Sequence, residues 1–457
     1  MLSIAPSDAS LEDRSDRFVV EALAGVLQPA WIHEAIVRSG RSAQRVRQLP
    51  AQLTLWTVIL LGLFRRHSYV NLLGMLFETG RHRCLWARRG APPCGSALTK
   101  ARDRLGVKPV RDVFERSARN WIATTDGHMF HGRRVFAIDG TTLRLPDTPE
   151  NEACFGRPPA SRGHTSYPQL RMVTLRDTAT RLVPAVRFGP YRRAEITLAR
   201  NLVCDVESGS LVILDKNFLS YAFLWDLYAS GVDFLVRGKS NIKTEVLEEL
   251  GPGDAIVRVR LPRYLRHARP DLPREWILRR ITYRPAAATE DFVLLTTLLL
   301  AEEIPAYELS GLYPERWEEE TGYDELKTHL CDTTTITRPT SIRSRRPERV
   351  EQEVYGLLIA YNAMRITMAL AAPRAETPHP LPARRLSFIY TLERMREAVR
   401  DMMQAATIRL VERFEQLLDS IARAVVPLRP GRNYPRAVKR KMSNYPLKTP
   451  QRAAPSG

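Results

Sequence analysis

The sequence has few cysteines, and they are not arranged to build a disulfide framework or a zinc site. The five cysteines are scattered along 457 residues, and no two of them form a CxxC pair. An odd number of isolated cysteines argues against disulfide-stapled secreted folds and against zinc ribbons. The composition therefore predicts a protein of the reducing cytoplasm.

The sequence also lacks a long hydrophobic run. The longest apolar stretches are Leu53–Phe64 and Leu357–Ala372, and the second is interrupted by Asn362 and Arg365. A membrane-spanning helix needs about 20 apolar residues. The first 17 residues are polar and partly acidic, unlike a secretory signal. We therefore expect no membrane partner, and we expect Leu53–Phe64 to be a buried central helix.

Several common catalytic patterns are missing. The chain has no glycine-rich phosphate loop, no nucleophile elbow and no internal repeat, and its nine histidines cluster poorly. These absences argue against P-loop enzymes and serine hydrolases.

Acidic residues are fewer than basic residues in this sequence. The chain has 69 Lys and Arg against 50 Asp and Glu, a net charge of +19. Such an excess favours a polyanionic partner, nucleic acid before an anionic membrane. Two basic segments are candidate DNA contacts, although a solvated helix face is the alternative for the first: Lys100, Arg102 and Arg104, and Lys439, Arg440 and Lys441 in the tail.

The pattern of apolar residues divides the chain into six segments. Helical spacing predominates in 18–125 and again in 373–426, whereas strand-like runs fill 126–303. We expect a disordered lead-in (1–17), a helical N-terminal DNA-binding domain (18–125), an α/β domain (126–250 with 304–372), a β-rich insertion (251–303), a C-terminal helical region (373–426) and a basic tail (427–457).

Two aspartates stand on expected strands of the α/β domain. Asp139 lies inside a β-type run that begins at Arg133, and Asp215 follows the fully apolar run Leu211–Leu214. A fully apolar run is typical of a strand buried on both faces. A hairpin is expected between 168 and 188. The order of these elements predicts a mixed α/β sheet flanked by helices.

A third acidic residue belongs to the stretch YPERWEEETGYDELK. Tyr313, Arg316, Glu320 and Lys327 stand at offsets 0, 3, 7 and 14. At about 100° per residue, these side chains fall within about 60° of one another on a single α-helix. A solvated face with intrahelical ion pairs is one interpretation. The other is a metal-binding glutamate between groups that hold phosphate oxygens.

Asp139, Asp215 and Glu320 together offer three carboxylates from three elements. Three such charges repel one another unless a cation compensates them. Oxygen-only ligands favour Mg²⁺ or Mn²⁺. Two such ions could activate a nucleophile and stabilise the leaving oxygen of a phosphodiester.

These motifs resemble those of bacterial DDE transposases of the insertion-element-four family. The tyrosine, arginine, glutamate and lysine at those offsets are similar to the family signature, and FAIDGTTLRLPDTPEN and LVILDKNFLSY resemble its two aspartate motifs. Lys216-Asn217 stands where the commoner form has Arg-Gly. SALTKARDRLG and RPERVEQEVYGLLIAYNAMR also look like the family's flanking segments.

The resemblance implies a ribonuclease-H-like core in which Asp139, Asp215 and Glu320 bind two Mg²⁺ ions, with Mn²⁺ able to substitute. It also implies strand cleavage by water, then strand transfer by the freed 3′-hydroxyl, with a hairpin at the element end. Tyr313 and Arg316, with Lys327, would hold phosphates. The partners implied are double-stranded DNA, as terminal inverted repeats and target, and a second copy in the synaptic complex. The setting implied is the bacterial cytoplasm, at the nucleoid.

Further site residues are suggested by position. Trp276 in the insertion is a candidate for stacking on a flipped base, with a plain strand-core tryptophan as the alternative. Arg237 and Lys239 are candidate DNA contacts. Two other functions remain open: a metal-dependent nuclease of the same core, and a catalytically silent DNA-binding protein derived from a transposase.

Overall fold

The computed structural model describes residues 23, 25–42, 49–78, 92–127, 129–160, 163–164, 167–239, 242–285, 290–331, 340–404 and 409–427. The expected lead-in, and the tail candidates Lys439, Arg440 and Lys441, lie outside the described residues. The described cysteines are all free.

The first part of the described chain is helical. Helix α3 is apolar on all sides and is therefore almost completely buried. Gly106, with a φ of 72°, ends α6 in a conformation that favours glycine. The helices are α2 (Pro29–Arg38), α3 (Ala51–Leu63), α4 (Tyr69–Glu78), α6 (Gly95–Leu105) and α7 (Lys108–Thr124).

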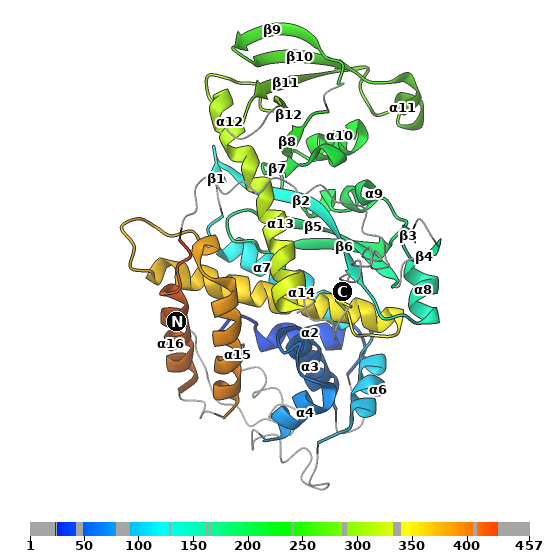
Figure 1. Cartoon of the computed structure of the whole chain (residues 1–457), viewed down its shortest axis with the longest axis vertical. Helices are drawn as coiled ribbons and strands as arrows, with labels where there is room; N and C mark the ends of the chain where they lie inside the picture. Colours follow the sequence, from blue (N-terminus) through cyan, green and yellow to red (C-terminus); the bar gives the residue numbers. More distant parts are fainter. Residues whose placement is uncertain are drawn as a thin grey trace, which may run out of the picture.

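A ten-stranded mixed sheet runs from the middle of the molecule to its upper end in the view of Figure 1. Along one path its order is β6-β5-β2-β7-β8-β12-β11-β10-β9, with β1 paired to β2. Strands β6, β5 and β2 are antiparallel, whereas β2, β7 and β8 are parallel. This is the ribonuclease-H-like arrangement, so the predicted fold class is confirmed. Its strands are β1 (Met129–Phe130), β2 (Arg133–Arg144), β5 (Gln169–Asp177), β6 (Ala185–Pro190), β7 (Leu211–Leu214) and β8 (Asp233–Arg237).

The β-rich insertion continues this sheet rather than forming a sheet of its own. Strand β12 pairs antiparallel with β8, and β11, β10 and β9 follow outward. The first of these strands begins at Glu245, six residues earlier than expected. The strands are β9 (Glu245–Gly251), β10 (Asp254–Arg260), β11 (Glu275–Tyr283) and β12 (Phe292–Thr296), and α11 (Arg263–Ala268) lies between β10 and β11.

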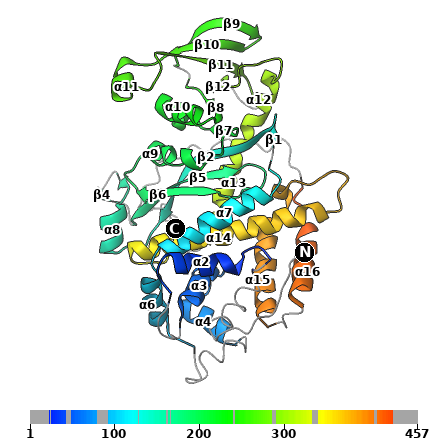
Figure 2. The same cartoon turned by 180° about the vertical axis from the view of Figure 1, so that it is seen from behind.

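Alternation along β2 separates the two faces of the sheet. Phe136 and Ile138 face α9 (Glu195–Arg200) and α10 (Tyr221–Ala229). Val135 belongs to the core on the opposite face, under α12 (Ala306–Leu312). Seen from front and back, α12 and α13 (Trp317–Asp324) cross one face (Figures 1 and 2). A small helix, α8 (Pro149–Phe155), and the short pair β3 (Pro159–Ala160) and β4 (Gly163–His164) lie at one end.

The long helix α14 (Pro347–Ala371) runs beneath the sheet and packs against α3 and α7. Residues 347–374 are apolar and long enough to cross a membrane by length and composition alone, yet 83% of the most apolar window is buried inside the protein. It is the central core helix of this fold. The C-terminal helices α15 (Phe388–Gln404) and α16 (Leu410–Ala422) pack beside it.

Candidate active site

Two neighbouring strands bring Asp139 and Asp215 together. Strands β2 and β7 are parallel, with Ile138 opposite Leu214, and each aspartate is the next residue along its chain. Open α/β sheets place their ligands at such carboxyl ends. Asp139 faces α13, because it alternates in step with Val135.

Helix α13 adds the third carboxylate from above this edge. It packs against β2, and both terminal nitrogens of Arg316 donate to Glu320 Oε1 at 3.2 Å. Nη1 of the same guanidinium lies 3.8 Å from Asp139 Oδ2. Arg316 therefore links a strand carboxylate to a helix carboxylate. The negative charge of Asp215 also favours the protonated guanidinium and so raises the pKa of Arg316.

The carboxyl group of Asp139 has a raised pKa. Burial raises its pKa to about 6, and the negative charges of Asp215 and Glu195 act in the same direction. A hydrogen bond of 2.7 Å from the Gly140 amide and the charge of Arg316 oppose that rise. Desolvation is the dominant cause of the raised pKa, because burial disfavours the charged carboxylate. A positive charge added at this site would oppose that effect and favour the carboxylate.

The other two signature residues also lie along this edge. Lys327 donates from Nζ to Thr141 Oγ1 at 3.1 Å, on the same face of β2 as Asp139. The Tyr313 hydroxyl approaches the carbonyl oxygen of Leu214 at 3.5 Å, directly before Asp215. Tyr313 is buried in the core, so in this structure it supports the strand end rather than presenting its hydroxyl to solvent.

The segment that carries the signature is not one α-helix, as the spacing predicted. It is a 3₁₀ turn over Tyr313–Arg316, an α-helix over Trp317–Asp324 and a π turn over Glu325–Leu330. A 3₁₀ turn winds more tightly than an α-helix and a π turn more loosely. Relative to one continuous α-helix, the first turn is wound more tightly and the last more loosely, so the two changes in winding act in opposite directions. Tyr313, Arg316 and Lys327 still contact the same edge of the sheet.

The chemistry of the donors fits a hard divalent cation, because Asp139, Asp215 and Glu320 offer only carboxylate oxygens. Among the described residues, however, no three His, Cys, Asp or Glu side chains form a ready-made set of metal ligands. Two of the three acids, Asp139 and Glu320, are instead in contact with the Arg316 guanidinium.

Sequence reasoning missed the buried support beneath the site. Glu319 is completely buried and accepts from Arg176 Nε at 2.7 Å. The Tyr323 hydroxyl donates to the backbone oxygen of Asp139 at 2.7 Å and shares a hydrogen bond with Thr174. The only available signal was the triplet of glutamates at 318–320, and spacing alone could not assign different roles to its members.

A fourth carboxylate on the opposite face of β2 was also missed. A Cβ atom on Gly140 would stand 2.6 Å from Glu195 Cδ, so glycine is needed for this approach. Glu195 pairs with Arg171 at 3.2 Å and raises the pKa of Asp139. Gly140 thus lets a distant acid influence the site.

Trp276 lies in the core, as the alternative interpretation held. It is only 6% exposed. Three aromatic rings surround it, those of Trp225, Tyr228 and Phe234, with centroids between 5.2 and 5.7 Å away. No face is left for stacking on a base, because these contacts build the core beneath α10.

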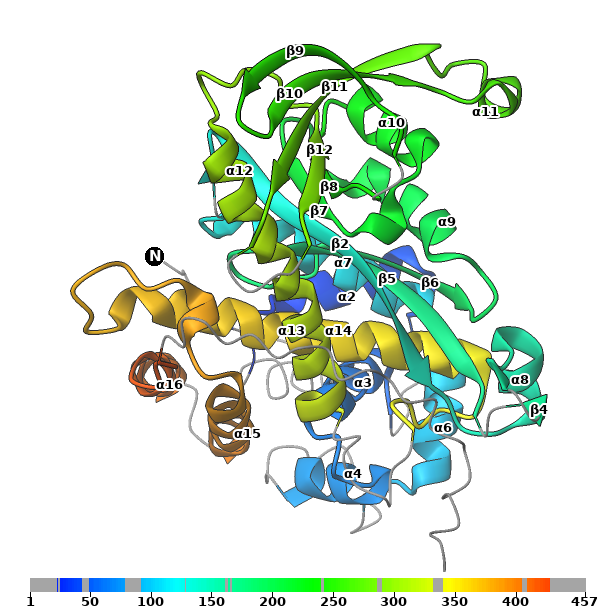
Figure 3. The same ribbon diagram turned by 45° about the horizontal axis from the view of Figure 1, so that its top comes forward.

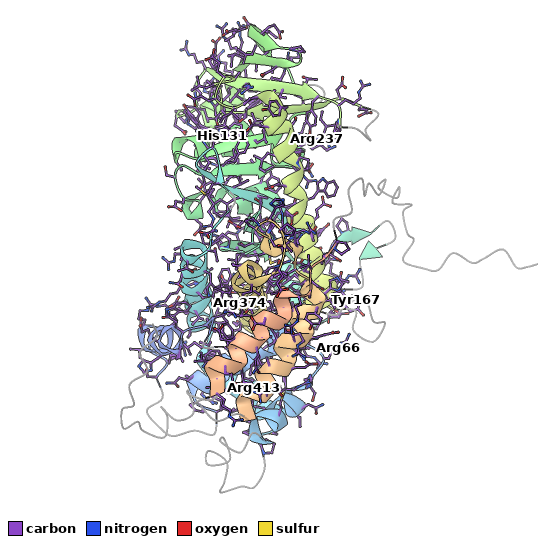
Figure 4. The ribbon with its side chains drawn as sticks, turned by 90° about the vertical axis from the view of Figure 1, so that its left-hand side faces the viewer. Arg66, His131, Tyr167, Arg237, Arg374 and Arg413 are labelled. Atoms are coloured by element: carbon purple, nitrogen blue, oxygen red, sulfur yellow. The ribbon has the colours of Figure 1, made fainter. Side chains whose placement is uncertain are left out.

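The candidate DNA contacts divide by exposure. Arg102 is buried, and the prediction that it contacts DNA is wrong, because the phase of α6 turns it inward to bond Gln352 and Ser344. Lys100, Arg104 and Lys239 are exposed. Arg237 is half-buried over the Phe292 ring at 3.6 Å. Figure 4 shows Arg237 in the sheet-containing part of the molecule, with Arg66, Arg374 and Arg413 in the helical part.

Comparison with protein families gives two matches. The transposase DDE domain family matches residues 130–363, which include Asp139, Asp215 and Glu320. The insertion element 4 transposase N-terminal family matches residues 17–115.

Individual relatives give the same picture. The transposase InsG for insertion sequence element IS4 of Escherichia coli K12 is 31% identical over 430 residues, 93% of each chain. The putative transposase InsZ of the same strain is 29% identical, over 56% of this chain and 82% of its own. A solved synaptic complex of piggyBac transposase with hairpin DNA covers 92% of this chain and 88% of its own, at 14% identity and a TM-score of 0.43.

Proposed function

The chain belongs to the DDE-domain transposases of insertion elements, and on that premise we propose that it binds the ends of its own element and catalyses metal-dependent cleavage and strand transfer there. The observation that carries the proposal is the contact of one guanidinium, that of Arg316, with both Asp139 and Glu320. This contact brings a sheet carboxylate and a helix carboxylate to one point.

Asp139, Asp215 and Glu320 are the residues that would hold two Mg²⁺ ions, or Mn²⁺ in their place. Bound there, such ions lower the pKa of a nucleophilic water or hydroxyl and stabilise the leaving oxygen. Arg316 is then free to turn from the acids to a phosphate oxygen, which its planar group can hold with two hydrogen bonds. Lys327 contributes a second positive charge along the same edge.

Tyr313 has a different part in this proposal. Its ring fills the core beside β7, and its hydroxyl lies at the carbonyl of Leu214. It keeps the chain that leads into Asp215 in place. Direct contact between its hydroxyl and a phosphate would require the end of α12 to move.

The DNA partners in this proposal are the terminal inverted repeats and the target duplex. Two ends must be held together for transfer, which calls for two copies of the chain in the synaptic complex. Water would first cleave one strand at the element end, and the freed 3′-hydroxyl would attack the opposite strand, which forms a hairpin and releases the flanking DNA. A second water would open the hairpin and return the 3′-hydroxyl, which would then join the target strand and release a target 3′-hydroxyl. The setting is the bacterial cytoplasm, at the nucleoid.

The test uses a duplex that carries the element's terminal repeat, incubated with Mg²⁺ or Mn²⁺. We expect wild-type protein to nick the end, to give a hairpin band on a denaturing gel, and to join the end to a plasmid. Asp139→Ala and Glu320→Gln should lose all three products while retaining end binding. Cleavage without joining would favour the nuclease alternative. Binding without cleavage would favour the silent DNA-binding alternative.

A further inference from the structure

A basic cavity lies on the insertion, away from the carboxylates. Its volume is about 470 Å³, and four basic residues line it: Arg263, Arg266, His267 and Arg274. The first three belong to α11, and Arg274 leads into β11. Among the residues that the structure describes, the lining includes no acidic side chain.

The arginines of this cavity differ from their neighbours in having no acidic partner among the described residues. Elsewhere on the insertion, Arg258 pairs with Glu245 and Glu275, and Arg284 pairs with Asp291 at 2.7 Å. The charges of the cavity arginines are therefore not neutralised within the described part of the chain, and their guanidinium groups can bind an anionic ligand.

Helix α11 and the segment that follows it are attached to the rest of the protein by an ion pair and by apolar contacts. Arg269, directly after α11, donates to Asp226 on α10 at 2.7 Å. Leu265 and Leu272 pack into the core formed by α9, α10 and the sheet. The backbone that carries the basic residues is therefore held against the rest of the protein by these contacts.

These contacts also show which side of the sheet the cavity occupies. Leu272 belongs to the same core as Phe136 and Ile138, whereas Asp139 faces α13 on the opposite side. Figure 3 shows α11 beside α10, away from α13. The group that occupies the cavity is therefore not the phosphate that is cleaved.

We propose that this cavity binds backbone phosphates of a stretch of DNA other than the cleaved end, an inference that rests on the proposed function. Arginine side chains hold phosphate oxygens with paired hydrogen bonds. The net charge of +19 favours a polyanion over a single small anion. Tyr264, on the same helix, is 75% exposed and can pack against a sugar or an unstacked base.

The test compares Arg263→Ala/Arg266→Ala with the control Arg284→Ala, in which the lost charge was already paired. Binding of full-length protein is measured by fluorescence anisotropy at several salt concentrations. The probes are a short terminal-repeat duplex, a longer duplex extended inward from that repeat, and an unrelated target duplex. Losing two phosphate contacts should reduce the slope of the logarithm of the binding constant against the logarithm of the salt concentration by about 1 to 2. It should also weaken binding at least about tenfold. The control should change affinity less than about twofold.

The pattern across probes identifies the DNA. Loss only with the longer duplex assigns the cavity to the inner part of the element end, and loss with the target duplex assigns it to target DNA. Arg263→Lys/Arg266→Lys should restore the salt dependence, which a folding defect would not allow. Unchanged affinity and salt dependence for all three duplexes would overturn the proposal. So would inorganic phosphate at about millimolar concentration abolishing the difference between wild type and variant.

Failure of the proposed function would look different. In that case wild-type protein would not cleave with either metal, yet the double variant would still bind DNA less tightly than the control.

Discussion

Three consecutive glutamates of α13 have three different arginine partners. Glu318 pairs with Arg181, Glu319 with Arg176, and Glu320 with Arg316. Successive helix positions differ by about 100°, so the middle residue points into the core and its neighbours point to either side. Glu320 is the most exposed of the three, at 36%, and Arg316 links it to Asp139.

This difference in surroundings predicts that alanine substitutions of Glu319 and Glu320 differ in their effects on stability and on cleavage. Glu319→Ala leaves the Arg176 guanidinium buried without its partner, which should lower the free energy of unfolding by about 3–5 kcal/mol. Glu320→Ala removes a partly exposed ion pair and should cost less than about 1 kcal/mol, while abolishing cleavage. Denaturant unfolding and the nicking assay on the same preparations measure both effects. Similar stability losses in the two variants would contradict the division of roles.

The raised pKa of Asp139 predicts how stability and activity depend on pH. Because the pKa in the folded metal-free protein is about 6 and the ordinary value is about 3.8, the folded state favours the protonated form. The stabilising contribution is complete below the ordinary value and is lost as pH rises through about 6. Metal binding requires the carboxylate, so metal affinity should fall as pH drops below about 6.

Asp139→Asn tests both parts of this expectation. At pH 8 the variant without metal should be more stable than wild type, by up to about 3 kcal/mol for a shift of about two pKa units, and less if Arg316 loses its partner. It should not cleave DNA, and its Mn²⁺ binding, followed by calorimetry, should be weak at every pH. Greater stability of wild type at pH 8 would show that burial does not dominate at this carboxyl.

At the scale of the element, the signature segment depends on one close contact with the sheet. A Cβ atom on Gly322 would stand 2.4 Å from the Arg176 guanidinium. Arg176 also donates to Tyr361 on α14 at 2.8 Å. Helix α13 therefore lies close enough to β5 for Glu319 to reach Arg176 only because residue 322 has no side chain.

Spacing alone predicted which residues of this segment share a face, but not its shape. Tyr313, Arg316 and Glu320 were placed correctly relative to one another, since a short offset tolerates a small change in helical twist. The spacing gave no indication of the π turn around Lys327. Glu325 in that turn is held by Arg181 and Arg365, and nothing local to the sequence indicates those partners.

Gly322→Ala is therefore expected to destabilise the protein even though alanine is the better helix former. The added methyl group must push Arg176 away from Glu319, at a cost of about 2–4 kcal/mol. Gly311→Ala in α12 is the matched control, because a Cβ atom there meets nothing within 4 Å, and should gain up to about 1 kcal/mol. Thermal unfolding measures both. Equal stability of the two variants would refute the close-contact account.

At the scale of the whole molecule, the N-terminal helices and the sheet share one hydrophobic core. Trp56 and Leu60 of α3 belong to the same core as Leu170 of β5 and Leu357 of α14. The sequence predicted helices in the N-terminal part from their periodicity. Periodicity carries no information about which element an apolar helix packs against, so the sharing of the core became visible only in the structure.

Helices α3 and α14 cross at a pair of glycines. A Cβ atom on Gly62 would stand 2.9 Å from the backbone oxygen of Gly356, and one on Gly356 would stand 2.8 Å from that of Val58. Beside the crossing, Arg65 of the α3 end forms a buried ion pair with Glu353 of α14, whose pKa the arginines around it lower to about 2. Neither helix can shift along this contact without losing both features.

The last prediction follows from this crossing. Gly356→Ala places a methyl group against the backbone of α3, which cannot move as a side-chain end can, and should destabilise the protein by about 2–3 kcal/mol. Because α3 and β5 share this core, amide hydrogens of α3 and of the Leu170 end of β5 should both exchange faster, by about the same factor of 30 to 150. Gly74→Ala in α4, where a Cβ atom meets nothing within 4 Å, should leave both unchanged. Faster exchange in α3 with unchanged exchange in β5 would mean that the N-terminal helices unfold independently of the sheet, and would contradict the shared core.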